Sequence, residues 1–97
     1  MRIVLGVPEI DVRVSPEGDR YVAHVTVRDR ATTRHTVRIS PDELRRYGGG
    51  DVMDLVRRSF EFLLAREPST SILREFDLGV IERYFPEYPR AIGGGSR

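Results

Sequence analysis

The chain has 97 residues, 39% of them hydrophobic and 32% charged, which fits one compact domain with one modest core. Sixteen basic residues, all arginine, nearly balance fifteen acidic ones, so the net charge of +1 predicts no strong attraction to nucleic acid or to membranes. Lysine and cysteine are absent. Their absence excludes a Schiff base, a phosphate-loop lysine, a thiol nucleophile, a disulfide and a thiolate metal site.

Alternating apolar and polar residues predict antiparallel strands in the first 39 residues. We expect strands over residues 10–14, 21–28 and 36–39, with residues 2–7 as a candidate fourth strand. Residues 15–19, Ser-Pro-Glu-Gly-Asp, predict a turn, since proline presets φ and glycine is free to adopt a positive φ.

The register that keeps the apolar residues on one face pairs Val14 with Tyr21 and Val27 with Val37. The other face of this predicted sheet then carries an excess of arginine. Three of these side chains are candidate contacts for nucleic acid or another anion: Arg13, Arg28 and Arg38.

The same register places the only two histidines opposite carboxylates, His24 opposite Asp11 and His35 opposite Asp29. We expect both to be exposed cross-strand pairs, because no third group completes a catalytic site and neither has the spacing of metal ligands. The sequence therefore predicts no catalytic residue, no metal site and no cofactor.

The second half of the chain predicts helices. Ser40, Pro41 and Glu43 form a capping-box pattern for a short helix that ends at the glycines 48–50. Asp51 caps a long central helix that ends before Pro68. Its apolar arc of about 200° predicts burial on two sides, against the sheet and against the C-terminal segment.

The C-terminal segment predicts two short helices, about 71–76 and 78–85, with Asp77 as a cap between them. Its aromatic residues Tyr84, Phe85 and Tyr88 are candidate partner-binding residues, since two prolines stiffen this stretch. The alternative, which we favour, is that they fold back over the end of the core. Residues 93–97, Gly-Gly-Gly-Ser-Arg, predict a flexible tail outside a domain of residues 1–92.

Residues 35–64 run from a strand through a proline-initiated helix and a glycine loop into an arginine-bearing helix. This order is similar to the ribbon-helix-helix repressors, which pair the strand between two subunits and read DNA with it. The resemblance implies that Thr36, Arg38 and His35 would face DNA. The first helix is shorter than that family's, and Asp51 and Asp54 stand where a phosphate would approach.

Three stretches in residues 59–88, Ser-Phe-Glu-Phe-Leu-Leu, Ser-Ile-Leu-Arg-Glu-Phe-Asp-Leu and Tyr-Phe-Pro-Glu-Tyr, resemble a family of small prokaryotic proteins of unknown function. That resemblance implies no catalytic or binding residue.

Together these features predict a single α+β domain, with a three- or four-stranded antiparallel sheet packed on a long central helix and short C-terminal helices after it. We expect a non-catalytic, cytoplasmic interaction or regulatory module whose partner is another protein or a second copy of the chain, with no membrane association. The alternatives are a ribbon-helix-helix-like DNA-binding regulator and, third, a small enzyme. Residues 1–8 are too short for the apolar core of a signal peptide.

Overall fold

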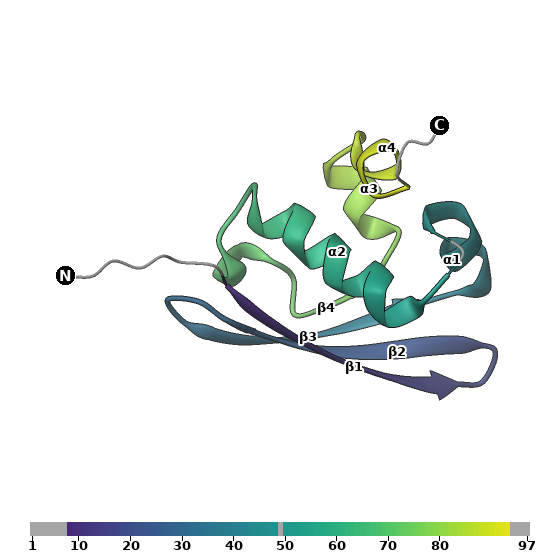
Figure 1. The fold of residues 1–97 in the computed structure, drawn as a ribbon, viewed down its shortest axis with the longest axis horizontal. Helices are drawn as coiled ribbons and strands as arrows, with labels where there is room; N and C mark the ends of the chain where they lie inside the picture. The colour runs from purple at the N-terminus through teal and green to yellow at the C-terminus, as the bar shows by residue number, and fades with distance from the viewer. Residues whose placement is uncertain (1–7, 49, 94–97) are drawn as a thin grey trace.

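The computed structural model of the chain describes residues 8–48 and 50–93 and confirms the α+β class (Figure 1). The elements, in chain order, are β1 (Glu9–Glu17), β2 (Arg20–Arg28), β3 (Thr32–Ile39), α1 (Pro41–Tyr47), α2 (Val52–Leu64), a 3₁₀ turn (Ser69–Ser71), β4 (Glu75–Asp77), α3 (Val80–Tyr84) and α4 (Tyr88–Ile92). The candidate strand at residues 2–7 and residues 94–97 of the predicted tail lie outside the described residues.

The sheet has the order β1-β2-β3-β4, and the prediction of a purely antiparallel sheet is wrong. β1, β2 and β3 are joined as antiparallel hairpins, whereas β4 lies parallel to β3. The predicted helix over 71–76 and the predicted cap at Asp77 are also wrong, because this stretch contributes the edge strand. The amide of Thr36 donates to the Arg74 carbonyl and that of Leu78 to the Arg38 carbonyl, so bonding to β3 overrides the local helical pattern.

The predicted register is wrong in both hairpins. Val14 lies opposite Ala23 and not Tyr21, and Val37 also lies opposite Ala23 and not Val27. Both shifts are by an even number of residues, which moves no side chain to the other face, so apolar alternation cannot detect them. The turn decides the first register, because Gly18, at φ 64°, allows β1 to continue to Glu17.

Both predicted histidine pairs are wrong for the same reason. His24 lies opposite Arg13 and Thr36 and is exposed, whereas His35 lies opposite Val25 on the apolar face and is only 3% exposed. The ring of His35 packs 5.3 Å from the ring of Phe60, measured between centroids. One of the two imidazoles therefore belongs to the core.

The predicted caps of α1 and α2 are confirmed. The Ser40 hydroxyl accepts from the Glu43 amide, and the Glu43 carboxylate accepts from the Ser40 amide. Asp51 caps α2 by accepting from the Met53 amide. The prediction of a long central helix is wrong, because α2 has 13 residues and the chain turns away after Leu64, before Pro68. A proline disfavours helical backbone in the residue that precedes it.

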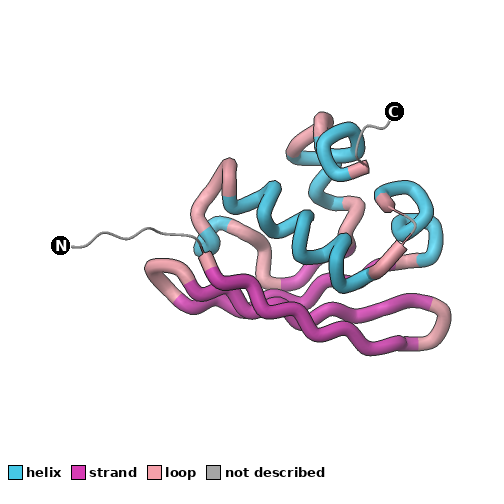
Figure 2. Tube along the Cα trace, in the orientation of Figure 1, coloured by secondary structure: helices cyan, strands magenta, loops and turns pink. Residues whose placement is uncertain are grey.

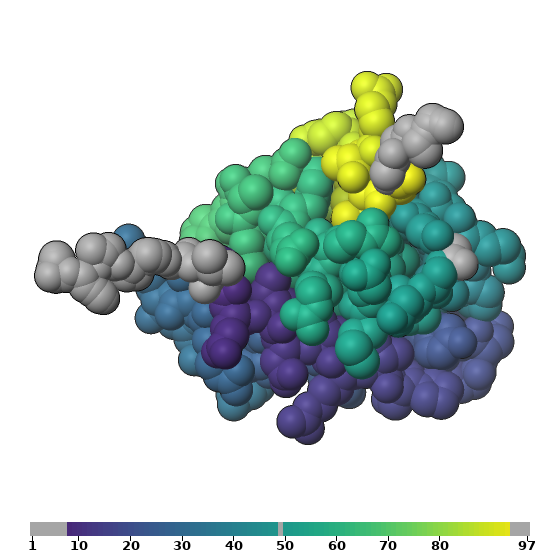
Figure 3. All heavy atoms as spheres, viewed as in Figure 1, coloured from purple at the N-terminus to yellow at the C-terminus, as the bar shows by residue number. Residues whose placement is uncertain are grey.

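All the helices lie on one side of the sheet (Figure 2). α2 runs along that side (Figure 1), and α4 packs on α2. The atoms of α4, in yellow, lie above those of α2, in teal, and farther from the strands (Figure 3). The core lies between the sheet, α2 and the C-terminal helices. Its largest fully buried side chains are Tyr88, Phe60, Ile39, Leu55, Leu78, Val25, Val27, Val37 and Val56.

Candidate functional site

The three C-terminal aromatics that the sequence singles out have three different environments. Tyr88 is fully buried, Phe85 is partly buried, and Tyr84 is 67% exposed. Phe85 and Tyr88 both pack on Phe62 of α2, with ring centroids 5.7 and 5.3 Å away. The predicted fold-back over the core therefore describes Phe85 and Tyr88, and Tyr84 alone projects from it.

Tyr88 is anchored by a polar contact inside the core. Its hydroxyl lies 2.6 Å from the Ser59 hydroxyl, which also donates to the Leu55 carbonyl over 2.7 Å. Burial raises the pKa of Tyr88 above its ordinary value. Ser59 is thus the small buried residue that lets α4 approach α2, and its hydroxyl satisfies a phenol that would otherwise be orphaned.

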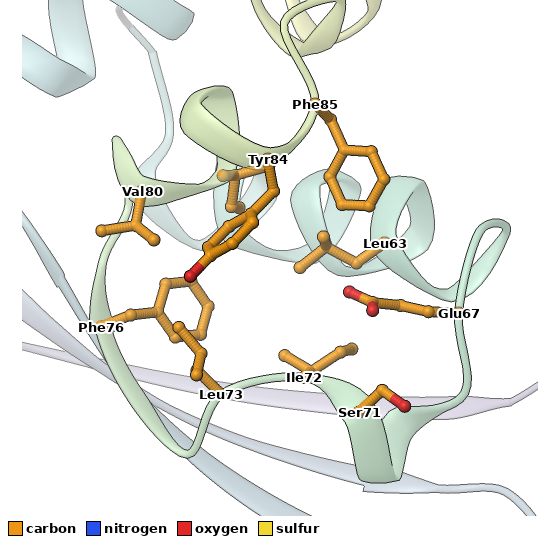
Figure 4. A pocket seen from close by; sticks show the side chains of 10 residues that line it. Leu63, Glu67, Ser71, Ile72, Leu73, Phe76, Val80, Tyr84 and Phe85 are labelled. Carbon is orange, nitrogen blue, oxygen red and sulfur yellow. The ribbon is translucent and has the colours of Figure 1, made fainter.

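Tyr84 and Phe85 border an apolar pocket of about 360 Å³ between the C-terminal end of α2, residues 71–76 and α3 (Figure 4). Its lining is Leu63, Glu67, Ser71, Ile72, Leu73, Phe76, Val80, Ile81, Tyr84 and Phe85. We call it the apolar pocket. Its volume lies near the lower end of the range typical of ligand pockets.

The rim of the apolar pocket carries two exposed apolar side chains. Leu73 is 47% and Tyr84 67% exposed, and Figure 4 shows the Tyr84 side chain reaching over the cavity toward Leu73 and Phe76. The one other exposed large hydrophobic residue in the described part of the chain is Met53, at the far end of α2. Exposed apolar area is therefore concentrated at this pocket.

Glu67 supplies the one charged group in the lining of the apolar pocket. Its carboxylate points toward the cavity (Figure 4) and forms no ion pair with another described residue. No arginine lines the cavity. The pocket is therefore apolar with one negative corner.

Polar contacts fix α3, which forms one wall of the apolar pocket, to α1. The Tyr47 hydroxyl donates to Glu82 over 2.7 Å, and Arg46 pairs with the same carboxylate at 2.9 Å. Burial and the bond to Glu82 raise the pKa of Tyr47 to about 12. The Gly79 amide donates to Glu43, and a Cβ at Gly79 would lie 2.8 Å from that carboxylate, so a larger residue would have to displace the Glu43 carboxylate.

The predicted anion contacts Arg13, Arg28 and Arg38 lie on the sheet face that carries no helices, each on a different strand. Each is within 4 Å of a carboxylate, namely that of Asp11, Glu9 or Glu75 respectively. The structure brings these arginines to one face but partly neutralises each of them. Their contact with nucleic acid stays a prediction.

β3 corresponds to the DNA-reading strand in the ribbon-helix-helix resemblance. Here it lies between β2 and β4, so its central residues 36–38 have a neighbour within the chain on each side. In residues 8–48 and 50–93 no helix could cross a membrane, and no three His, Asp or Glu side chains gather as metal ligands would.

Comparisons of the chain with protein-family models, curated proteins and solved structures give no match. Two of the aromatic candidates, Tyr84 and Phe85, line the apolar pocket. The sequence does not indicate that Leu63, Glu67 and Leu73 line it as well. The helix that the sequence predicts over 71–76 would place Leu73 in the core. In the structure Leu73 lies in the irregular segment before β4 and is exposed.

Proposed function

We propose that the protein is a non-catalytic interaction module that binds a segment of another protein in the apolar pocket. A large apolar side chain of the partner would enter between Leu63, Ile72 and Phe85, and a basic side chain would lie near Glu67. The observation that carries the proposal is an open apolar cavity whose rim exposes Leu73 and Tyr84.

Exposure of the rim favours a protein partner. Small soluble proteins seldom leave neighbouring large apolar side chains in water unless they are covered by a partner. Tyrosine is common among the residues that dominate binding energy, because its ring gives a large contact area and its hydroxyl still finds a polar partner. Tyr84 fits this role, since its neighbour Phe85 is held on Phe62.

Charge favours a basic residue in the partner. Glu67 projects into a cavity that contains no positive group, so an approaching carboxylate would be repelled and a guanidinium or ammonium attracted. A contact partly shielded by the pocket walls is screened less than one in open solvent.

Selection of peptides tests this proposal. A random peptide library is panned on the immobilised full chain, and the affinities of enriched peptides are measured by fluorescence anisotropy. We expect the enriched peptides to share a large apolar residue with Arg or Lys close by. Leu73→Asp should weaken their binding by ~10-fold or more, as expected for loss of a central apolar contact. Glu67→Gln should lower the preference for the basic residue.

Met53→Asp is the matched control, because Met53 is 42% exposed, close to the 47% of Leu73, and lies outside the pocket. It should leave peptide affinity unchanged. The proposal is wrong if selected peptides bind the Leu73→Asp variant as tightly as the unaltered chain. It is also wrong if the chain is a dimer in sedimentation that Leu73→Asp dissociates, since the occupant would then be a second copy.

A further inference from the structure

A second pocket, of about 340 Å³, lies at the edge of the sheet where β3 extends beyond β4. It is lined by Thr32, Thr33, Arg34, His35, Ser69, Thr70, Ile72 and Arg74. The residues that line it carry four hydroxyls, two guanidinium groups and one imidazole. The lining contains no carboxylate. We call it the basic pocket.

Arg34 and Arg74 reach the basic pocket from two elements, the first from β3 and the second from the residue before β4. Neither forms an ion pair with another described residue, in contrast to Arg13, Arg28 and Arg38 on the sheet. An anion bound in the pocket would therefore meet two guanidinium groups that have no counter-charge among the described residues.

Hydrogen-bond donors accompany the two positive charges. The hydroxyls of Thr32, Ser69 and Thr70 can each donate to an anion. The backbone adds another donor. The Thr36 amide faces the β4 side and donates to the Arg74 carbonyl, so the Arg34 amide, two residues earlier, faces the same edge beyond the end of β4.

His35 forms a fixed wall of the basic pocket. Its Nδ1 lies 2.8 Å from the Leu73 carbonyl, which can only accept, so Nδ1 carries the proton. Its Nε2 then accepts from the Thr33 hydroxyl over 2.9 Å. Burial and the nearby Arg74 lower the pKa of His35, so the ring is neutral at neutral pH. The ring thereby orients Thr33 and connects the pocket to the core.

We propose that the basic pocket binds the phosphate group of a small molecule, held between Arg34 and Arg74 and bonded by the surrounding hydroxyls. Arginine suits this ligand because its planar guanidinium donates two parallel hydrogen bonds to phosphate oxygens. The volume is near the lower limit of small-molecule pockets, which allows for a phosphate and a small organic group. This site shares only Ile72 with the proposed peptide site.

Titrations of the full chain with inorganic phosphate and with phenyl phosphate, followed by amide and imidazole NMR at constant ionic strength and neutral pH, test the proposal. Sodium chloride and benzoate serve as anions without a phosphate group. We expect saturable binding of a phosphate compound that shifts the signals of Thr33, His35 and Thr70. Tighter binding of phenyl phosphate would identify a phosphate monoester as the ligand, and equal binding would identify free phosphate.

Arg34→Gln and Arg74→Gln should each weaken phosphate binding by ~10-fold or more, since each removes charged hydrogen bonds. Both side chains belong to exposed residues, so the variants should fold, which circular dichroism would verify. Arg83→Gln is the control, because Arg83 is exposed, outside the pocket and without an ion pair to a described residue. The proposal is overturned if neither phosphate compound binds more tightly than ~10 mM. It is equally overturned if Arg83→Gln weakens binding as much as Arg74→Gln, or if benzoate binds as well as phenyl phosphate.

Discussion

The two pockets share one side chain, Ile72, and differ in almost every other respect. The apolar pocket lies toward α2 and α3 and contains one negative group. The basic pocket lies toward the edge of β3 and contains two positive groups and four hydroxyls. One short segment, residues 69–74, separates them. A segment with little regular structure thus creates two chemically opposed surfaces, because each of its sides faces a different element.

The boundary between the pockets extends into the core through Phe60. This ring packs against His35 of the basic pocket and against Phe76 of the apolar pocket, with centroids 5.3 and 6.2 Å away. Phe60 is fully buried on α2. The two pockets are therefore different at their surfaces but depend on the same buried ring.

Phe60→Ala should produce the largest effect, because this ring supports both pockets. We expect a loss of ~3–5 kcal/mol in the free energy of unfolding, because the substitution leaves a cavity beneath both. Urea denaturation measures the loss. Met53→Ala, at an exposed position of the same helix, should change stability by less than ~0.5 kcal/mol. A Phe60→Ala chain that unfolds at the same urea concentration as the unaltered chain would show that the ring is not central.

Tyr88→Phe should weaken the attachment of α4 to α2. The phenol contacts Ser59, which keeps its bond to the Leu55 carbonyl, so we expect a loss of ~0.5–1.5 kcal/mol in the free energy of unfolding. Tyr84→Phe in the same aromatic stretch should change stability very little, since Tyr84 projects into solvent. Equal losses from the two substitutions in thermal melts would contradict the assignment of Tyr88 to the core and Tyr84 to the rim.

Acid should lower the free energy of unfolding through His35, which lines the basic pocket. The folded-state pKa of His35 lies below its ordinary value of 6.5, so the unfolded chain takes up this proton more readily than the folded one. Above pH 6.5, His35 should therefore not affect the free energy of unfolding. As the pH falls below that value, the free energy of unfolding should decrease, with the slope expected for uptake of at most one proton by the unfolded chain. The decrease should end below the folded-state pKa. Urea titrations between neutral and mildly acidic pH measure this.

The matched control for the acid effect is His24→Asn, because His24 is exposed. It should retain the same loss of stability with pH, whereas His35→Asn should not. A pH response unchanged in His35→Asn would place the titrating group elsewhere.

Glu82 titrates in a lower pH range than His35. Its bonds to Arg46 and Tyr47 lower its pKa below 4.5, so its contribution to stability is present above that value and is lost at more acidic pH.

The smallest expected effect concerns Arg13, Arg28 and Arg38, whose nearby carboxylates contrast with the unpaired arginines of the basic pocket. We expect weak binding of duplex DNA without sequence preference, and a contact with three phosphates should weaken ~40-fold between about 50 and 200 mM salt. Anisotropy of labelled duplexes measures this. Sequence-specific nanomolar binding that persists at the higher salt concentration would instead favour the ribbon-helix-helix alternative.

The sequence by itself determined the features that depend on neighbouring residues. The capping box at Ser40 and Glu43 and the cap at Asp51 are short-range patterns, and both occur as expected. The turn predicted over residues 15–19 is correct only at Gly18 and Asp19, because residues 15–17 continue β1. The α+β class follows from a change of apolar period near residue 40. In each case the interacting groups lie within a few residues, so no knowledge of the rest of the fold is needed.

Apolar alternation did not decide the register of the hairpins, and only the tertiary structure decided the burial of His35 and the strand at β4. Registers that differ by an even number of residues bury the same faces, so alternation does not choose between them. β4 forms because β3 offers backbone hydrogen bonds to residues 74–78, which are more than thirty positions away in the chain. Both pockets border on this segment. Their chemistry was therefore decided by a long-range pairing of backbone groups, and such a pairing leaves no periodic signal in the sequence.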